Sequence, residues 1–322
     1  MIVNESKPQL PASSCQLRPV FIAGPTAVGK SGIALALAEK IGGEIISADS
    51  MQVYRGLDIG TAKPSPAERA RVPHHLIDIC DLTENFDAAQ FVRLAQNAVT
   101  EIRSRNKTPI FCGGTGLYFK AFLSGLGEAP ATNPELRAEL EASSFEALLR
   151  ELRERDPATY EKIDKQNPRR VIRAIEVIRL TGKKFSEQRA EWKTPGAVPE
   201  KINFYCFTRA SADLHARINV RVEEMFRRGL VSETRELLQH GLEQNKTAMQ
   251  AIGYRQAVEH LRGGRDLAET IELVKSRTRQ FAKRQLTWFR RHGNCEWIGL
   301  KPDEAPEKSL QKICSAIQRG IG

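Results

Sequence analysis

The stretch that most constrains this chain is Gly24-Pro25-Thr26-Ala27-Val28-Gly29-Lys30-Ser31, which has the spacing G-x-x-x-x-G-K-S. An apolar run over residues 20–23 precedes it and predicts a strand, and residues 32–39 follow it and predict a helix. A strand, this loop and a helix form a phosphate-binding loop, in which glycines let backbone amides turn inward and the helix N-terminus adds partial positive charge. Lys30 is expected to reach a terminal phosphate, and the Ser31 hydroxyl to hold Mg²⁺. A glycine-rich turn without function does not explain both flanks, but the motif does not specify which phosphate compound binds.

The charge of the chain favours a large anionic partner. The formal net charge is +10, and nucleic acid is the usual partner of such a protein, although many basic proteins bind none. The six cysteines include no C-x-x-C pair and no Cys/His metal spacing, which indicates reduced thiols in a cytoplasmic protein. No apolar run approaches the about 20 residues that span a membrane, so no membrane association is expected.

Two further strands are predicted to end beside the phosphate-binding loop. Residues 44–50 contain a short apolar run that ends at Asp49, and residues 109–112 form another run that ends in Gly113-Gly114-Thr115-Gly116. In open α/β sheets, ligands bind at the carboxyl ends of parallel strands, so Asp49 is a candidate site residue. The alternative for Asp49 is a helix cap or a turn aspartate. No acidic residue directly follows Cys112, where an ATPase would place its metal-binding acid, which argues against ordinary ATP hydrolysis.

The middle of the chain predicts a helical insertion. Residues 135–155 predict one charged amphipathic helix, and Asn167-Pro168 predicts the start of another that ends at Gly182. Residues 183–199 predict an exposed loop. We therefore expect a loose N-terminal tail over 1–18, an α/β core over 19–127 and 201–322, and an inserted helical domain over 128–200. The arginines of this insertion are consistent either with a solvated face or with RNA contact.

The last third of the chain returns to the sheet and then becomes basic. Residues 203–208 predict a strand, a long helix is expected from Asp213, and residues 295–299 predict a final strand. Residues 272–291 predict a helix in which lysines and arginines are interleaved with aromatic residues. That combination suits phosphate contact and base stacking.

Several motifs, taken in order, resemble one family. Besides the loop at 24–31 they are Asp49-Ser50-Met51-Gln52-Val53-Tyr54-Arg55, residues 58–64 (DIGTAKP), residues 74–78 (HHLID), residues 113–118 (GGTGLY), residues 167–171 (NPRRV), residues 253–255 (GYR) and residues 283–285 (KRQ). The series resembles the bacterial tRNA dimethylallyltransferases, also called tRNA isopentenyltransferases, over about residues 19–300. No single motif except the first is specific, but the whole series is.

The resemblance implies a fold, an activity and partners. The fold would be a P-loop NTPase-like parallel sheet flanked by helices, with a helical insertion domain. The activity would be transfer of a dimethylallyl group from dimethylallyl diphosphate to N6 of the adenine that follows the anticodon, in tRNAs that read codons beginning with U. The loop would then hold a diphosphate leaving group, with Mg²⁺ as cofactor. We expect a monomer.

The resemblance and the chemistry together assign roles to residues. Asp49 is expected to be the general base for N6, and Thr115 to orient substrate or metal at the reaction centre. Residues 24–31, with Arg217 or Arg221, are expected to bind diphosphate, and Ser31 to bind the metal. The expected tRNA contacts are Asp49, Ser50, Met51, Gln52, Thr115, Arg137, Gln166, Asn167, Pro168, Arg169, Arg170, Gln250, Ala251, Ile252, Gly253, Tyr254, Arg255, Lys283, Arg284, Gln285, Leu286, Thr287, Trp288, Phe289 and Arg290.

Two other functions share these features. An ATP-dependent small-molecule kinase would use the same loop and sheet, and it predicts ATP binding and phosphate transfer. A non-catalytic RNA-binding protein predicts that substitutions in the loop leave RNA binding intact.

Overall fold

The computed structural model describes residues 18–126, 130–188, 202–302 and 306–319. Contacts divide the chain into two compact units, Met1–Ala121 with Pro199–Gly322, and Phe122–Val198. The first is an α/β unit and the second is helical. The predicted insertion over 128–200 lies mostly in the second unit, and the predicted tail lies outside the described residues except for Arg18.

A six-stranded parallel sheet forms the centre of the α/β unit, with strand order β3-β2-β4-β1-β5-β6. The strands β1, β2 and β4 are buried along their whole lengths, as apolar strands with both faces covered must be. In chain order the strands are β1 (Val20–Ala23), β2 (Gly43–Ala48), β3 (His74–His75), β4 (Thr108–Gly113), β5 (Asn203–Arg209) and β6 (Glu296–Leu300).

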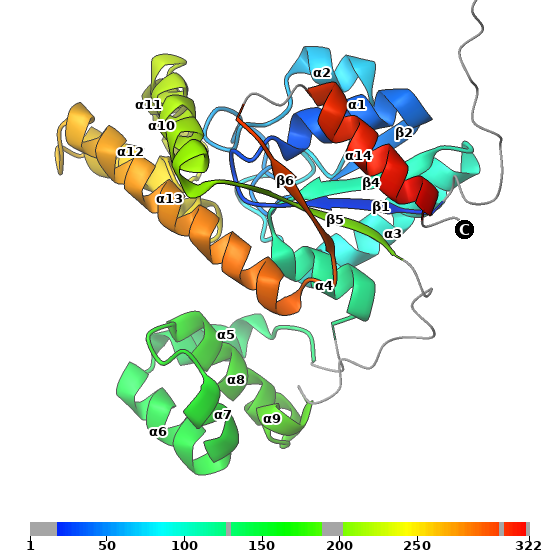
Figure 1. Cartoon of the computed structure of the whole chain (residues 1–322). Helices are drawn as coiled ribbons and strands as arrows, with labels where there is room; N and C mark the ends of the chain where they lie inside the picture. Colours follow the sequence, from blue (N-terminus) through cyan, green and yellow to red (C-terminus); the bar gives the residue numbers. More distant parts are fainter. Residues whose placement is uncertain (1–17, 127–129, 189–201, 303–305, 320–322) are drawn as a thin grey trace, which may run out of the picture. The chain divides into compact units, whose positions relative to one another are not determined.

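Helices cover both faces of this sheet. Figure 1 shows α1 and α14 on one side and α3 and α4 on the other. On the α1 side, aliphatic residues of α1 pack with Ile218 of α10 and Val274 of α13 in one buried cluster. On the opposite face, the rings of Phe21, Phe119 and Phe204 lie against one another. The helices of this unit are α1 (Lys30–Ile41), α2 (Pro66–Arg71), α3 (Ala88–Ser104), α4 (Gly116–Ser124), α10 (Ser211–Arg227), α11 (Leu230–Gln239), η2 (Ala248–Gln250), α12 (Tyr254–Leu261), α13 (Leu267–His292) and α14 (Pro306–Arg319).

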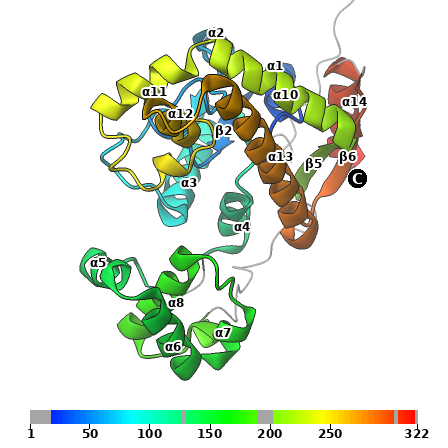
Figure 2. The same cartoon turned by 90° about the vertical axis from the view of Figure 1, so that its left-hand side faces the viewer.

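The helices α10 to α13 form a group beside the sheet, and this group faces the viewer in Figure 2. The 26-residue helix α13 packs against both α10 and α12. It contains the predicted basic helix over 272–291, and Asp266 caps its start by accepting a hydrogen bond from the Glu269 amide. None of the described helices combines the length and the apolar character that crossing a membrane requires.

The helical unit has its own core. Leu140, Leu148, Leu152 and Ile175 are fully or almost fully buried in it. Its helices are α5 (Pro134–Ala142), α6 (Phe145–Arg155), α7 (Pro157–Lys162), α8 (Pro168–Thr181) and α9 (Phe185–Gln188). The predicted start at Asn167-Pro168 and end at Gly182 are confirmed, because Asn167 caps α8 and Gly182 adopts a left-handed conformation with φ of 70°.

Two local predictions in this unit were wrong. The single helix expected over 135–155 is two helices, because the chain leaves the helical conformation at Ser143, where ψ is 152°. Each half then packs its apolar side on α8 separately. The loop expected over 183–199 contains α9, and its residues 189–199, including Trp192, lie outside the described residues.

Asp156 is a fully buried carboxylate that organises the helical unit. It accepts hydrogen bonds from the amide and hydroxyl of Thr159, at 3.0 and 2.6 Å, and from the amide and hydroxyl of Ser186, at 2.7 and 2.8 Å. Burial alone would raise the pKa of Asp156, but these four donors outweigh it and hold the pKa below its usual value.

We predict that Asp156→Asn destabilises the helical unit by about 2–4 kcal/mol, since an amide nitrogen cannot accept the bonds that a carboxylate oxygen accepts. Urea unfolding at neutral pH, with Asp164→Asn as an exposed control, measures this difference. Because the folded pKa is depressed, the contribution is present above the unfolded pKa and disappears as pH falls through the folded pKa. A difference between Asp156→Asn and the wild type that persists unchanged in strong acid would contradict the assignment.

Candidate active site

The carboxyl ends of three neighbouring strands create the site. Ala48 of β2 pairs with Gly113 of β4, and Gly113 pairs with Ala23 of β1. The strand ends approach so closely that a Cβ atom on Gly113 would lie 2.0 Å from the Ala48 carbonyl oxygen. Glycine is therefore required there, and the approach brings Asp49, which follows β2, to the same edge as the loop that follows β1.

The phosphate-binding loop has the backbone that its sequence predicts. Gly24 and Gly29 have φ of 152° and 106°, a region that side chains disfavour, and Ala27 is also left-handed with φ of 62°. A Cβ atom on Gly24 would lie 2.9 Å from the carbonyl oxygen of Phe207. The loop leads directly into α1, whose first residue is Lys30, so the first amides of the helix are available to an anion.

Three side chains from distant elements fix this loop. Gln285 of α13 accepts a hydrogen bond from the Thr26 amide at 2.9 Å and donates one to the Gly114 carbonyl at 3.0 Å. Arg217 donates to the Ala27 carbonyl at 3.0 Å, and Arg209 donates to the Val28 carbonyl at 2.8 Å. The Thr26 amide is thus occupied by protein, which limits the diphosphate-binding role predicted for the backbone of 24–31 to the other amides.

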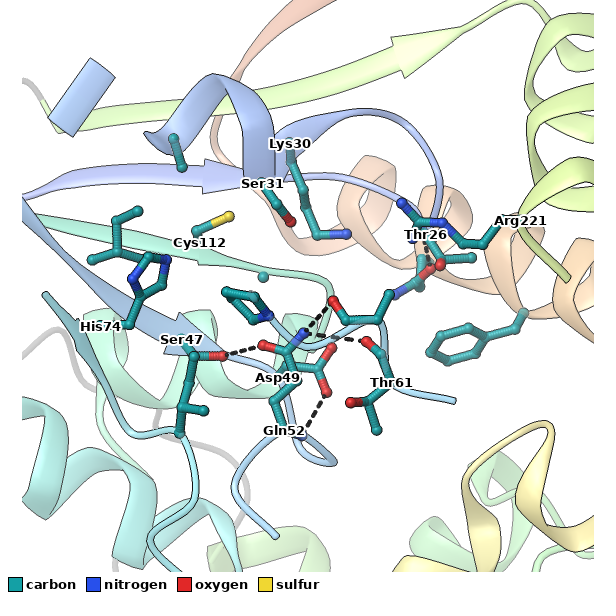
Figure 3. Close-up of a pocket in the computed structure, with 18 residues that line it drawn as sticks. Thr26, Lys30, Ser31, Ser47, Asp49, Gln52, Thr61, His74, Cys112 and Arg221 are labelled. Carbon is teal, nitrogen blue, oxygen red and sulfur yellow. Dashed lines mark hydrogen bonds between the residues drawn. The ribbon is translucent and has the colours of Figure 1, made fainter. Parts of the chain in front are cut away.

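The loop, Asp49 and Arg221 line one pocket, shown in Figure 3. Basic and acidic groups are both present, and Figure 3 shows Lys30 and Asp49 on opposite sides of the same space. The lining residues include Thr26, Lys30, Ser31, Ala34, Ile45, Ser47, Asp49, Gln52, Thr61, Ala62, Ile77, Cys112, Arg221, Phe281 and Gln285. Arg217 lines an adjoining pocket that shares Lys30, Ser31 and Arg221 with the first.

The electrostatics of this pocket favour an anionic ligand. Burial lowers the pKa of the Lys30 amine, and the positive charge of Arg221 lowers it further, while Asp49 opposes the shift. Burial and the neighbouring Arg217 likewise lower the pKa of Arg221. Cations that are desolvated and close to one another are stabilised when an anion binds between them.

Asp49 is held by the turn that follows β2. Its Oδ1 atom accepts hydrogen bonds from the amides of Met51, at 2.9 Å, and Gln52, at 3.4 Å. Among the hydrogen bonds of the described residues, Oδ2 of Asp49 is not used, so it is available to accept a proton. Thr115 accepts a hydrogen bond from the Ser50 amide at 3.1 Å and is not among the residues that line the pocket, so in this structure it supports the turn.

The donor set of this edge fits Mg²⁺. The Ser31 hydroxyl and the Asp49 carboxylate are hard oxygen ligands that line the same pocket. Within the described residues, no group of three or more His, Cys, Asp or Glu side chains could hold a metal. Mg²⁺ usually takes one or two protein ligands and completes its coordination with phosphate oxygens and water.

Some of the predicted tRNA-binding residues are exposed to solvent and others are buried. The exposed side chains in the α/β unit are Gln250, Arg255, Lys283, Arg284, Thr287 and Arg290. Gln250, Arg255 and Arg284 line a groove on α12 and α13 together with Arg265 and Arg277. In the helical unit Gln166, Pro168, Arg169 and Arg170 are exposed, Asn167 caps α8, and Arg137 pairs with Glu141 at 3.5 Å.

Five residues of the predicted tRNA set are buried. They are Ala251, Gly253, Tyr254, Gln285 and Phe289. The ring of Phe289 packs against Phe119 and Trp288, and Gln285 bridges the loop and Gly114 as described above. The alternation of basic and aromatic residues along α13 therefore partly reflects packing, since every third or fourth residue of a helix lies on the same face.

Sequence reasoning missed Arg209 and Phe281. Arg209 is the last residue of β5, and its position at a strand end is the signal that could have indicated it. Phe281 lies one turn before Gln285 on α13, is 38% exposed, and presents its ring to the pocket with the guanidinium of Arg284 5.8 Å from the ring centre.

A parallel sheet whose phosphate-binding loop faces a carboxylate at the same edge defines an α/β protein with a P-loop NTPase-like fold. The IPP transferase family model matches residues 52–292. A tRNA dimethylallyltransferase 1 of Trichlorobacter lovleyi is 44% identical over 292 residues, which cover 89% of this chain and 95% of the relative. A tRNA dimethylallyltransferase of Halorhodospira halophila is 44% identical over 93% of this chain and 98% of the relative.

Solved structures of similar fold belong to the same class of enzyme. The tRNA isopentenylpyrophosphate transferase of Bacillus halodurans has a TM-score of 0.70 and 39% identity, covering 94% of this chain and 96% of that chain. A eukaryotic dimethylallyltransferase acting on tRNA has a TM-score of 0.78 and 29% identity, covering 94% of this chain and 80% of that chain. The chain belongs to the IPP transferase family, and it is an enzyme.

We predict that Gln285→Met weakens dimethylallyl diphosphate binding more than tRNA binding. The substitution leaves the half-buried Thr26 amide and the buried Gly114 carbonyl without partners. An unsatisfied buried group costs about 1–3 kcal/mol, and this allows the loop to shift. Isothermal titration with each substrate measures the effect. The exposed Lys283→Ala on the same helix is the control and should show the opposite preference. A loss of tRNA affinity alone in Gln285→Met would favour the original tRNA-contact prediction.

Proposed function

We propose that this enzyme transfers a dimethylallyl group from dimethylallyl diphosphate to N6 of the adenine 3′-adjacent to the anticodon, in tRNAs that read codons beginning with U. The observation that carries the proposal is the single pocket in which Lys30 and Arg221 face Asp49. The relatives named above, which are tRNA dimethylallyltransferases, support the choice of substrates.

The leaving group is stabilised by the loop side of the pocket. As the bond between the allylic carbon and the diphosphate oxygen breaks, negative charge develops on diphosphate. The Lys30 amine, the Arg221 guanidinium and the first amides of α1 are already placed to receive that charge, because the hydrogen bonds from Arg217 and Gln285 fix the loop. Stabilisation of this preorganised kind is usually the largest single contribution to catalysis. Mg²⁺ bound at Ser31 would add Lewis-acid stabilisation of the same diphosphate oxygens.

The nucleophile is activated on the opposite side. The N6 amine of adenine is a weak nucleophile, because its lone pair is delocalised into the ring. Oδ2 of Asp49 accepts an N6 proton while the N6–carbon bond forms, and the products are N6-(dimethylallyl)adenosine and diphosphate. The amides of Met51 and Gln52, which bind Oδ1, keep the carboxylate in place during this transfer.

The five-carbon chain requires an apolar surface next to the charged groups. Ala34, Ile45, Ile77 and Phe281 supply such a surface within the same pocket. An apolar wall also excludes water, which would otherwise compete with N6 for the allylic carbon.

The acceptor adenine must leave its stack to enter the pocket, which costs a few kcal/mol. Phosphate contacts elsewhere can offset this cost. The exposed groups of the groove on α12 and α13, Arg255, Arg265, Arg277 and Arg284, are placed for such contacts in the α/β unit. In the helical unit, the exposed side chains of Gln166 and Arg170 are assigned to tRNA contacts.

Family membership favours this function over an ATP-dependent small-molecule kinase and over a non-catalytic RNA-binding protein. The decisive experiment incubates the protein with labelled dimethylallyl diphosphate, Mg²⁺ and total tRNA, followed by digestion and identification of the nucleoside. We expect label in N6-(dimethylallyl)adenosine. Phosphate transfer from ATP without labelled nucleoside would instead identify the kinase.

We predict that Asp49→Asn lowers the single-turnover rate at saturating substrates by about 10²–10⁴-fold, the usual contribution of general-base catalysis. Asparagine keeps the Oδ1 acceptor of the turn and removes only the basic oxygen, so tRNA affinity should stay within about threefold. Rapid-quench assays measure the rate, and the surface substitution Asp81→Asn is the control. Wild-type turnover in Asp49→Asn would remove Asp49 from proton transfer.

A further inference from the structure

The loop over residues 57–64 forms part of the pocket wall without belonging to any helix or strand. Its residues Thr61 and Ala62 line the pocket, and their carbonyl oxygens accept hydrogen bonds from Nε2 of Gln52, at 3.2 and 3.4 Å. Oε1 of Gln52 accepts a hydrogen bond from Ser47 of β2 at 3.0 Å, as Figure 3 shows. The position of this loop therefore sets the position of Gln52, which lies three residues after Asp49.

Two side chains from α11 and α12 hold the loop from outside the pocket. Both carboxylate oxygens of Glu233 accept a hydrogen bond from the Ile59 amide at 3.0 Å. The Tyr254 hydroxyl accepts a hydrogen bond from the Gly60 amide at 3.1 Å and donates one to Glu233 at 2.6 Å. We call Glu233 and Tyr254 the loop clamp.

The fit between clamp and loop is close. Tyr254 is fully buried, and a Cβ atom on Gly60 would lie 2.4 Å from its ring. The Glu233 carboxylate is partly removed from water in this position, and this burial raises its pKa. A separate set of bonds fixes the other side of the loop, where the buried Lys63 amine donates to Tyr54 and pairs with Asp58 and Asp78. The side chains of the clamp and of Lys63 do not line the pocket, so they have no direct role in binding the ligand there.

The clamp also joins the pocket to the basic groove. Tyr254 is adjacent to Arg255 at the start of α12, and Arg255 is exposed in the groove that also contains Arg277 and Arg284. Tyr254 thus holds the pocket wall, and the next residue, Arg255, is exposed in the groove. Because both lie in the first turn of α12, this turn links the position of the groove to that of the pocket wall.

We propose that Glu233 and Tyr254 are positioning residues for dimethylallyl transfer. Through the amides of Ile59 and Gly60 they hold the 57–64 loop in place. The loop in turn fixes the position of Gln52 relative to Asp49. This inference rests on the proposed function. A misplacement of about 1 Å at a reacting centre can cost about 10²-fold in rate, so loss of the clamp affects the chemical step more than substrate binding.

The test compares four variants in single-turnover assays at saturating substrates. Glu233→Ala and Tyr254→Phe should lower the rate by about 10–100-fold, while tRNA affinity changes by less than about threefold. Glu233→Gln should restore most of the rate, because its amide can still accept from the Ile59 amide and bond with the Tyr254 hydroxyl. Glu236→Ala, an exposed position on the same helix, is the control and should match the wild type.

Hydrogen–deuterium exchange tests the clamp without substrates. The Ile59 and Gly60 amides should exchange faster in Glu233→Ala and Tyr254→Phe than in the wild type, with melting temperatures above the assay temperature. Wild-type rates or unchanged exchange in both variants would overturn the inference, and so would a loss confined to tRNA affinity. Absence of dimethylallyl transfer by the wild type would instead refute the proposed function, and exchange would still report on the clamp.

Discussion

The parallel pairing of β2, β4 and β1 is the constraint on which the site depends. Parallel strands end at one edge, and here Gly113 lets the ends of β2 and β4 approach more closely than any side chain would allow. Asp49 therefore emerges beside the loop that follows β1. Without this approach, a general base and an anion site would still exist in the sequence, but they would not share a pocket.

The anion site is shaped by residues far from it in the sequence. Gln285, which lies 259 residues after Thr26, holds the Thr26 amide, and Arg217 and Arg209 hold the carbonyls of Ala27 and Val28. Two arginines thus act on the loop through hydrogen bonds to its backbone, while Arg221 reaches the pocket itself. Different cations therefore fix the backbone of the loop and face the diphosphate in the pocket.

Local sequence signals predicted most of the fold. The loop motif, the Asn167-Pro168 start of α8 and the glycine at its end depend on neighbouring residues only, and all three are confirmed. The break at Ser143 was missed because it depends on how each half of the predicted helix packs on α8.

The site was predicted less completely than the fold. Asp49, Lys30 and Arg221 were expected at the pocket and line it. Gln285 and Tyr254 were expected to contact tRNA and are buried, since a helix sequence does not show which face meets the core. Glu233 could not be recognised at all, because its loop partner Ile59 lies 174 residues earlier in the chain.

The most direct test of the central claim is the crystal structure of the enzyme with Mg²⁺ and the thio analogue of dimethylallyl diphosphate. We predict density for the diphosphate against Lys30, Arg221 and the start of α1, with the allylic carbon facing the Asp49 carboxylate. Diphosphate bound in the groove of α12 and α13, or an allylic carbon directed away from Asp49, would contradict the account.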